Sequence, residues 1–194
     1  MPTQISLNAP WKERSAAKKS SVLDGVPSQF IHSELEFRDD DASSALDIPS
    51  KFLIQEELSI TALDAVNIVR AIASKKYTCV QVLNAFTHRA AIAHKLLNCC
   101  LEFRYNAARV EAERLDRHYE ETGKLVGPLH GLPISVKDQC RIIGTETTCG
   151  FVANIGVVDT ENSVLVDILM RAGAVIFVKT NLSIGCFWGE TINK

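Results

Sequence analysis

Lys137 is the residue whose type and place in the chain best suit chemistry. It follows the apolar run 133–136 and precedes Asp138, so we expect a strand with a polar exit. A lysine at the end of such a strand can be partly buried, and burial disfavours its ammonium form. A lysine in that state can act as a general base at neutral pH, which an exposed lysine rarely does. On position alone, a lysine that ends a strand and reaches water is the more common case.

Other chemistry-bearing residues form weaker patterns. The stretch 173–180 has a glycine and a Lys-Thr pair like a phosphate-binding loop, but it lacks the second glycine and has an apolar strand in its middle. His88 and His94 do not share a helix face as paired metal ligands would, and His130 lies in a turn. We interpret all three as surface or loop histidines. The sequence therefore predicts no metal site, no cofactor-binding residue and no cofactor.

The six cysteines stand at positions 79, 99, 100, 140, 149 and 186. They form no Cys-x-x-Cys pair and have no regular spacing, so we expect reduced thiols rather than a disulfide framework. The adjacent pair Cys99 and Cys100 falls in an apolar stretch interpreted as helical. Small polarizable side chains there are expected to fill the core.

The composition excludes several classes of protein. Of 194 residues, 46% are hydrophobic and 23% charged, with a formal net charge of −2, which is typical of a soluble globular domain. A near-neutral chain has no basic face for nucleic acid or an anionic membrane, so neither is an expected partner. Neither a membrane-spanning run nor a secretory signal is evident, which predicts a cytoplasmic protein. The oligomeric state is not predicted.

The first part of the chain is expected to be helical. Residues 1–55, with an acidic run at 39–41, are interpreted as a solvated, partly irregular arm before a domain at 56–194. Apolar residues at helical spacing predict a helix that Thr61 caps and a second helix that begins with a capping box at Thr78 and Gln81 and runs to Leu97. A third helix is predicted over about 106–121, ended by Gly123.

In the second half of the chain, the sequence pattern changes from helices alone to alternating strands and helices. A short strand at 133–136, an amphipathic helix at 164–172 ended by Gly173, and an apolar strand at 174–178 predict a strand, helix, strand crossover. Such a crossover joins parallel neighbours in a sheet covered on both faces. The predicted fold is α/β, with an N-terminal helical region followed by the first part of a mixed, mostly parallel sheet covered by helices.

Residues 127–138, Gly-Pro-Leu-His-Gly-Leu-Pro-Ile-Ser-Val-Lys-Asp, resemble the lysine-bearing segment of the amidase-signature family. The likeness continues in the family's order and spacing through residues 144–148, Asp159, residues 169–174, residues 178–181 and residues 190–193. It covers about 56–194 and is strongest over 127–181. The N-terminal arm and the Val-Lys-Thr-Asn at 178–181 are most similar to the acetamidase-type amidases of fungi.

The resemblance implies an amidase that hydrolyses a small-molecule carboxylic amide to an acid and ammonia. Family members use a Ser, cis-Ser, Lys triad, in which the lysine draws a proton through a bridging serine and a second serine attacks the carbonyl. Backbone N–H groups of a glycine-rich loop stabilise the oxyanion. Lys137 matches the family's catalytic lysine. Thr147 and Thr148 either help line the site or cap the backbone locally.

The serines of this triad have no counterpart here. The chain contains no Gly-Gly-Ser-Ser stretch, and Ser163 and Ser183 lie in other contexts. We therefore expect an incomplete domain, truncated before the Gly-Ser-rich segment, and negligible amidase turnover by this polypeptide alone. The alternative is a catalytically dead, truncated protein with a binding or regulatory role, whose open sheet edge pairs with a partner chain.

Overall fold

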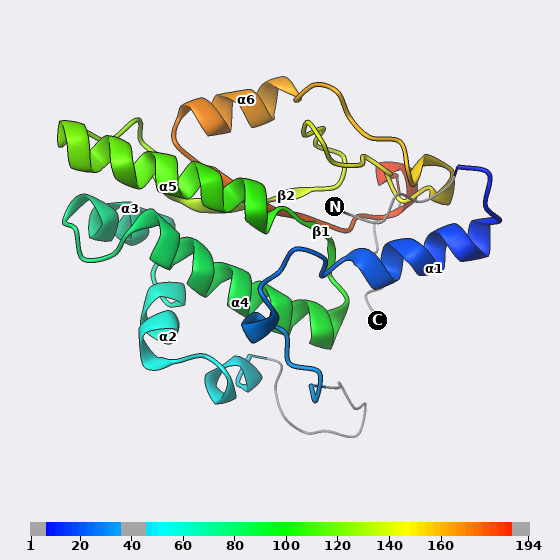
Figure 1. The fold of residues 1–194 in the computed structure, drawn as a ribbon, viewed down its shortest axis with the longest axis horizontal. Helices are drawn as coiled ribbons and strands as arrows, with labels where there is room; N and C mark the ends of the chain where they lie inside the picture. Colours follow the sequence, from blue (N-terminus) through cyan, green and yellow to red (C-terminus); the bar gives the residue numbers. More distant parts are fainter. Residues whose placement is uncertain (1–6, 36–45, 188–194) are drawn as a thin grey trace.

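The computed structural model of the chain describes residues 7–35 and 46–187 (Figure 1). The acidic run at 39–41 and the motif at 190–193 lie outside the described residues. The α-helices are α1 (Trp11–Ser21), α2 (Gln55–Thr61), α3 (Ala65–Ala73), α4 (Cys79–Leu97), α5 (Tyr105–Thr122) and α6 (Val164–Arg171). The strands are β1 (Cys100–Phe103), β2 (Pro133–Lys137) and β3 (Val175–Thr180). Short 3₁₀ turns are η1 (Ser28–Phe30), η2 (Ile48–Lys51), η3 (Val152–Asn154) and η4 (Ile184–Cys186).

The three strands form one sheet in the order β1-β3-β2. β2 and β3 are parallel and are joined through α6, which confirms the predicted crossover. β1 pairs with β3 antiparallel, so the mixed α/β fold is confirmed and the described sheet has one pairing of each kind. Lys137 pairs with Thr180 in the parallel register, and β2 lies at the edge.

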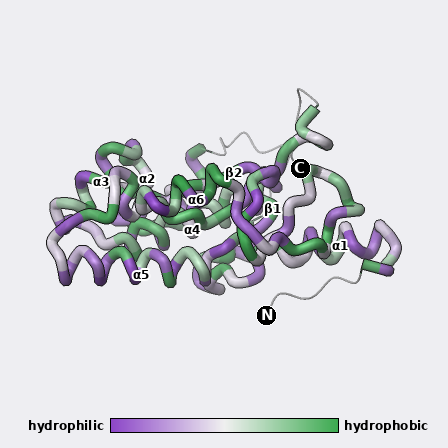
Figure 2. The backbone as a smooth tube through the Cα atoms, turned by 90° about the horizontal axis from the view of Figure 1, so that it is seen from above, coloured by the Kyte–Doolittle hydropathy of each residue, from purple (hydrophilic) through white to green (hydrophobic). Residues whose placement is uncertain are grey.

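Helices cover the two faces of the sheet differently. Val175 and Phe177 of β3 belong to the main core with α4 and α5, whereas Ile176 packs with Val136 and with Val166 of α6. Successive strand residues point to opposite faces, so α4 and α5 lie on one side and α6 on the other. In Figure 1, α6 lies above the strands and α4 below them. Figure 2 shows hydrophilic and hydrophobic stretches alternating along α5, as expected for a helix with one face in solvent.

The helical region confirms most expected boundaries. Thr78 and Gln81 form the predicted capping box of α4, and Gly123 ends α5 in the left-handed region at φ 66°. Thr61 is not a cap, because it ends α2, and Asp64 caps α3 by accepting a 2.8 Å hydrogen bond from the Asn67 N–H. In the part of the chain that the structure describes, no helix has the length and apolar character needed to cross a membrane.

The stretch around Cys99 and Cys100 was interpreted as helical, and this is wrong. α4 ends at Leu97, Asn98 takes up a left-handed conformation at φ 49°, and Cys100 begins β1. Asparagine tolerates this conformation better than most residues. The periodicity of apolar residues does not distinguish such a short strand from a continuing helix.

The N-terminal arm is docked rather than freely solvated where it is described. α1 lies beside η3, and Arg14 donates to the backbone carbonyls of Ala153 and Ile155 (Figure 1). Lys18 is buried and forms ion pairs with Glu102 at 3.2 Å and Glu146 at 3.1 Å. Lys18 and Arg14 therefore anchor this helix, while most of its residues remain exposed, as expected for a solvated segment. The domain boundary at residue 55 stays a prediction.

Candidate active site

Lys137 stands at the carboxyl end of β2 with its side chain exposed. Its Nζ lies 3.5 Å from the backbone carbonyl oxygen of Asn181, a long contact. Lys137 thus follows the more common case of a strand-ending lysine that reaches water, and β2 is the edge of the described sheet. The carboxyl ends of parallel strands are where α/β proteins commonly place their sites.

The lysine that is buried is Lys179 on β3. Its Nζ donates to the Glu146 carbonyl oxygen at 2.6 Å and to Thr147 Oγ1 at 3.1 Å. Burial lowers the pKa of Lys179, while the carboxylate of Asp138, 3.7 Å away, opposes that change. Lys179 pairs with Val136 and Lys137 with Thr180, so the two lysines point to opposite faces of the sheet.

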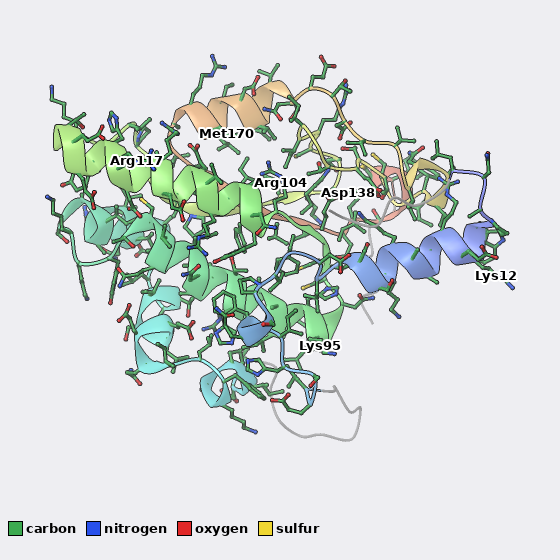
Figure 3. All side chains as sticks on the ribbon, in the orientation of Figure 1. Lys12, Lys95, Arg104, Arg117, Asp138 and Met170 are labelled. Carbon is green, nitrogen blue, oxygen red and sulfur yellow. The ribbon has the colours of Figure 1, made fainter. Side chains whose placement is uncertain are left out.

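Asp138, which is labelled in Figure 3, follows Lys137 directly and fixes the backbone there. Its N–H donates to the Thr180 carbonyl at 2.9 Å, which extends the β2–β3 ladder by one residue. Its carboxylate is 1% exposed and accepts hydrogen bonds from Thr148, from the hydroxyl at 2.7 Å and from the N–H at 3.3 Å. Because Asp138 is held from both sides, the backbone that carries Lys137 has little freedom.

The hydroxyl groups of Thr147 and Thr148, the two residues after Glu146, both donate hydrogen bonds to carboxylates. The Thr147 hydroxyl donates to Asp159 at 2.5 Å, and Arg141 holds the other oxygen of Asp159 at 3.1 Å. Thr148 also accepts the Gly150 N–H at 3.2 Å. The Gly150 contact favours the local-cap interpretation of Thr148, whereas the Thr147 hydroxyl contacts the distant side chains of Asp159 and Lys179. Because Lys179 donates to the Glu146 carbonyl and to the Thr147 hydroxyl, the loop after β2 is also joined to β3.

Asn181 supplies the carbonyl oxygen that the Lys137 ammonium contacts. The sequence did not predict this role for Asn181. Its N–H donates to the Cys99 carbonyl at 3.1 Å, and its amide Nδ2 donates to the Asn98 carbonyl at 2.9 Å. The turn between α4 and β1 therefore positions the carbonyl that Lys137 contacts. The local sequence signal of this turn is Asn98 itself, since asparagine tolerates the left-handed conformation that it has here.

His88, His94 and His130 are buried, so none is a surface residue, although His130 lies in a turn as predicted. His130 is 0% exposed, and its Nδ1 accepts the Val126 N–H at 3.1 Å, while burial lowers its pKa. His94 accepts the Cys100 N–H at 3.2 Å, and burial lowers its pKa too. His88 pairs with Glu57 at 3.0 Å. Within residues 7–35 and 46–187, no group of three or more potential ligands is arranged to hold a metal ion.

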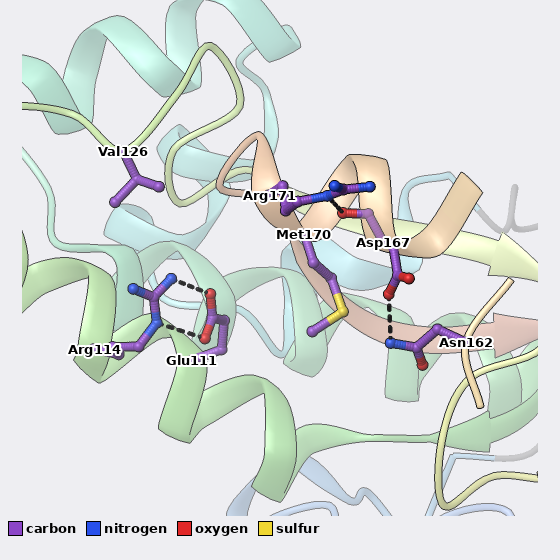
Figure 4. Close-up of a pocket in the computed structure, with 7 residues that line it drawn as sticks. All are labelled: Glu111, Arg114, Val126, Asn162, Asp167, Met170 and Arg171. Atoms are coloured by element: carbon purple, nitrogen blue, oxygen red, sulfur yellow. Dashed lines mark hydrogen bonds and ion pairs between the residues drawn. The ribbon is translucent and has the colours of Figure 1, made fainter. Parts of the chain in front are cut away.

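Two cavities lie away from the Lys137 side chain. The larger, about 600 Å³, lies between α5 and α6 (Figure 4) and is lined by Glu111, Arg114, Val126, Asn162, Asp167, Met170 and Arg171. Its charged groups are engaged internally, as in the 2.7 Å pair of Arg114 with Glu111. The smaller, about 260 Å³, lies between α1 and the loop 148–155, and Cys100 and Asn181 line it. Only the smaller cavity reaches a residue that positions Lys137.

The candidate site is thus a lysine at the carboxyl end of a parallel strand, next to a buried network of Asp138, Thr148 and Lys179. The Amidase family model matches residues 81–194, and the chain is a member of that family. It is 40% identical over 186 residues to an acetamidase of Emericella nidulans and 37% identical over 189 residues to an acetamidase of Aspergillus oryzae. These alignments cover 95% and 96% of this chain but 33% and 34% of the two relatives.

Solved structures agree with the sequence relatives. A fatty acid amide hydrolase superposes with a TM-score of 0.80 at 33% identity, over 90% of this chain and 32% of that one. A peptide amidase from Stenotrophomonas maltophilia gives a TM-score of 0.58 at 30% identity, over 62% and 25% of the two chains. The chain thus spans about a third of the length of its relatives, and its fold is a part of theirs.

Proposed function

We propose that this chain supplies the lysine of a Ser, cis-Ser, Lys amidase that hydrolyses a small carboxylic amide to its acid and ammonia. Lys137 is the proposed general base, and no cofactor is required. The observation that carries the proposal is the placement of Lys137 at the exposed carboxyl end of β2, where its ammonium contacts the Asn181 carbonyl oxygen and the next residue, Asp138, anchors the backbone. The relatives named acetamidase support an amide substrate.

The exposure of Lys137 suits this role. A side chain that leaves the sheet edge can meet the bridging serine from a segment beyond these 194 residues, which the family resemblance requires. Packing of that segment over β2 would desolvate the ammonium and favour its neutral, proton-accepting form. The backbone of Lys137 needs no rearrangement for this step, since Asp138 already holds it.

The six free cysteines support a cytoplasmic location, because reducing compartments keep thiols unpaired. The 194-residue chain by itself is proposed to be inactive, since it offers a base without the nucleophile. The exposed apolar side chains of α6, Val164, Leu165 and Ile168, fit a domain whose remaining layers are supplied elsewhere.

The intact mass of the protein isolated from its source, captured with an antibody against residues 56–120, tests the proposal first. A mass well above 21.4 kDa is expected. In that longer protein, Lys137→Ala should lower ammonia release from acetamide by about 10⁴-fold or more, while the exposed Lys124→Ala should leave it unchanged. A mass near 21.4 kDa would instead leave a protein without its nucleophile and support the binding role. Full activity of the Lys137 variant would overturn the assignment of the base.

A further inference from the structure

Cys99 and Cys100 place two thiols side by side at the start of β1. The left-handed turn at Asn98 brings their Sγ atoms within 3.9 Å of each other. Cys100 is buried at 6% exposure, while Cys99 is partly exposed. One thiol is therefore open to solvent and its neighbour lies directly behind it.

The environment makes the two sulfurs unequal. The hydrogen bond between the two sulfurs lowers the pKa of Cys99 to about 7. The same contact, with burial, raises the pKa of Cys100. Because the thiolate is the reactive form, the partly exposed sulfur is the nucleophile and the buried one holds the proton. Redox-sensing cysteines are commonly accessible and of low pKa, with a second, resolving cysteine nearby.

We propose that Cys99 and Cys100 form an oxidant-sensitive vicinal dithiol, a modification site at which peroxides convert the two thiols reversibly to a disulfide. The Cys99 thiolate attacks a peroxide oxygen, the O–O bond breaks, and Cys99 becomes a sulfenic acid as hydroxide leaves. The Cys100 sulfur then attacks Cys99, the S–O bond breaks, and a second hydroxide leaves. The two hydroxides leave as water, one with the Cys100 proton and one with a proton from solvent. The net reaction oxidises two sulfurs and reduces one peroxide to two waters.

The product is strained, which makes the modification reversible. Adjacent Cα atoms across a trans peptide are about 3.8 Å apart, whereas disulfides usually join Cα atoms about 4.4 to 6.8 Å apart. The peptide bond holds the two Cα atoms at this short distance, so the closed ring is strained. The Sγ atoms must also approach from 3.9 Å to about 2.05 Å, which requires rotation of the side chains and of the backbone dihedrals at Cys99 and Cys100. Strained disulfides have more oxidising potentials and are the ones that thiols reduce readily.

That backbone is the part of the chain that positions Asn181. The Asn98 and Cys99 carbonyls accept the two Asn181 hydrogen bonds, at 2.9 and 3.1 Å, and the Asn181 carbonyl faces Lys137 at 3.5 Å. A shift at Cys99 therefore loosens Asn181. That this affects catalysis rests on the proposed function, but the shift itself is a property of this chain.

Peptide mass spectrometry after treatment with hydrogen peroxide tests the modification. The peptide containing residues 99–100 is expected to lose two hydrogen atoms and to regain them with dithiothreitol. Cys99→Ser and Cys100→Ser should each abolish the loss. Cys149 and Cys186 are a second pair of neighbouring thiols, so the Cys149→Ser, Cys186→Ser variant is the matched control and should keep the loss. Wild-type protein that shows no such loss, or that links Cys99 to another cysteine, would overturn the proposal.

Hydrogen exchange of the Asn181 amide tests the coupling and needs no enzyme activity. Oxidation should raise the exchange rate of this amide by about 10-fold or more if its bond to Cys99 opens. The Cys99→Ser variant should show no change under the same treatment. A disulfide that forms while exchange at Asn181 stays constant would overturn the link to the site. If Lys137 proves not to be the general base, neither the disulfide measurement nor the exchange measurement changes. Failure of the proposed function can therefore be distinguished from failure of the dithiol proposal.

Discussion

The Nζ of Lys179 lies 3.7 Å from Oδ1 of Asp138, and the two side chains are 0% and 1% exposed. This buried ion pair joins β3 to the first residue after β2. It lies on the face of the sheet opposite to the Lys137 side chain. The arrangement separates two roles, because Lys179 holds the strand ends together while Lys137 is left free for chemistry.

Lys179→Met should destabilise the protein strongly. The substitution leaves the Asp138 carboxylate buried without its cation, and removal of one partner of a buried pair costs about 3 to 5 kcal/mol. Urea unfolding followed by circular dichroism measures the free energy of unfolding. Lys124→Met is the matched control on the surface and should change stability by about 0.5 kcal/mol or less.

A second substitution separates loss of charge balance from loss of packing. Asp138→Asn removes the charge, and its side-chain oxygen can still accept from Thr148. The double variant Lys179→Met, Asp138→Asn should therefore be more stable than Lys179→Met alone, by about 1 to 3 kcal/mol. Equal stability of the single and double variants would show that the ion pair is not what Lys179 contributes.

Lys137→Ala should leave the stability of this chain unchanged, within about 0.5 kcal/mol. The side chain is exposed and its hydrogen bond to Asn181 is long at 3.5 Å. The same unfolding experiment measures it. A loss comparable to that of Lys179→Met would show that Lys137 is structural in this chain and would weaken its assignment as the base.

The strand, helix, strand crossover and the place of Lys137 could be predicted, because they depend on local patterns. Apolar runs bounded by Gly127, Gly131 and Gly173 identify both strands without knowledge of what packs on them. The position of Lys137 at the exit of β2 then follows from the sequence alone. These elements need only the periodicity of their own residues.

What the sequence did not reveal depends on distant partners. Lys179 and Lys137 each end an apolar strand, and only the register places one inside and the other outside. The burial of His94 and His130 depends on backbone N–H donors at Cys100 and Val126, which no spacing rule connects to them. Strand β1 was missed because its partner β3 lies far along the chain.

His130→Gln should weaken the loss of stability on acidification. Burial lowers the pKa of His130 in the folded protein, so as pH falls below about 6.5 the unfolded chain binds a proton first. Stability is therefore full above that pH and falls below it, by at most about 1.4 kcal/mol per pH unit for one histidine. Unfolding in urea across this range should give a smaller pH slope for the variant. His94, whose pKa is also lowered by burial, accounts for part of the remaining slope.

Gly173→Ala should destabilise the protein more than Gly123→Ala, although both glycines have positive φ. At Gly173, φ is +93° and an added Cβ would lie 2.8 Å from the His130 Cα, whereas at Gly123, φ is +66° and nothing lies within 4 Å. An L-residue in the left-handed region costs about 1 to 2 kcal/mol, which both variants share.

Of these two glycines, Gly173 alone would bring its added Cβ against backbone, because α6 ends there against the turn that leads into β2. Overpacking against backbone adds about 1 to 3 kcal/mol, so the two variants should differ by that amount in urea unfolding. If Gly173→Ala proves too unstable to purify, Gly127→Ala tests the same interface, since its Cβ would lie 2.6 Å from the Ala172 carbonyl oxygen. Gly127 has no positive φ, so its loss would come from the contact alone. Equal losses at Gly123 and Gly173, or an unchanged stability of Gly127→Ala, would show that α6 and the turn 127–131 do not pack as closely in solution.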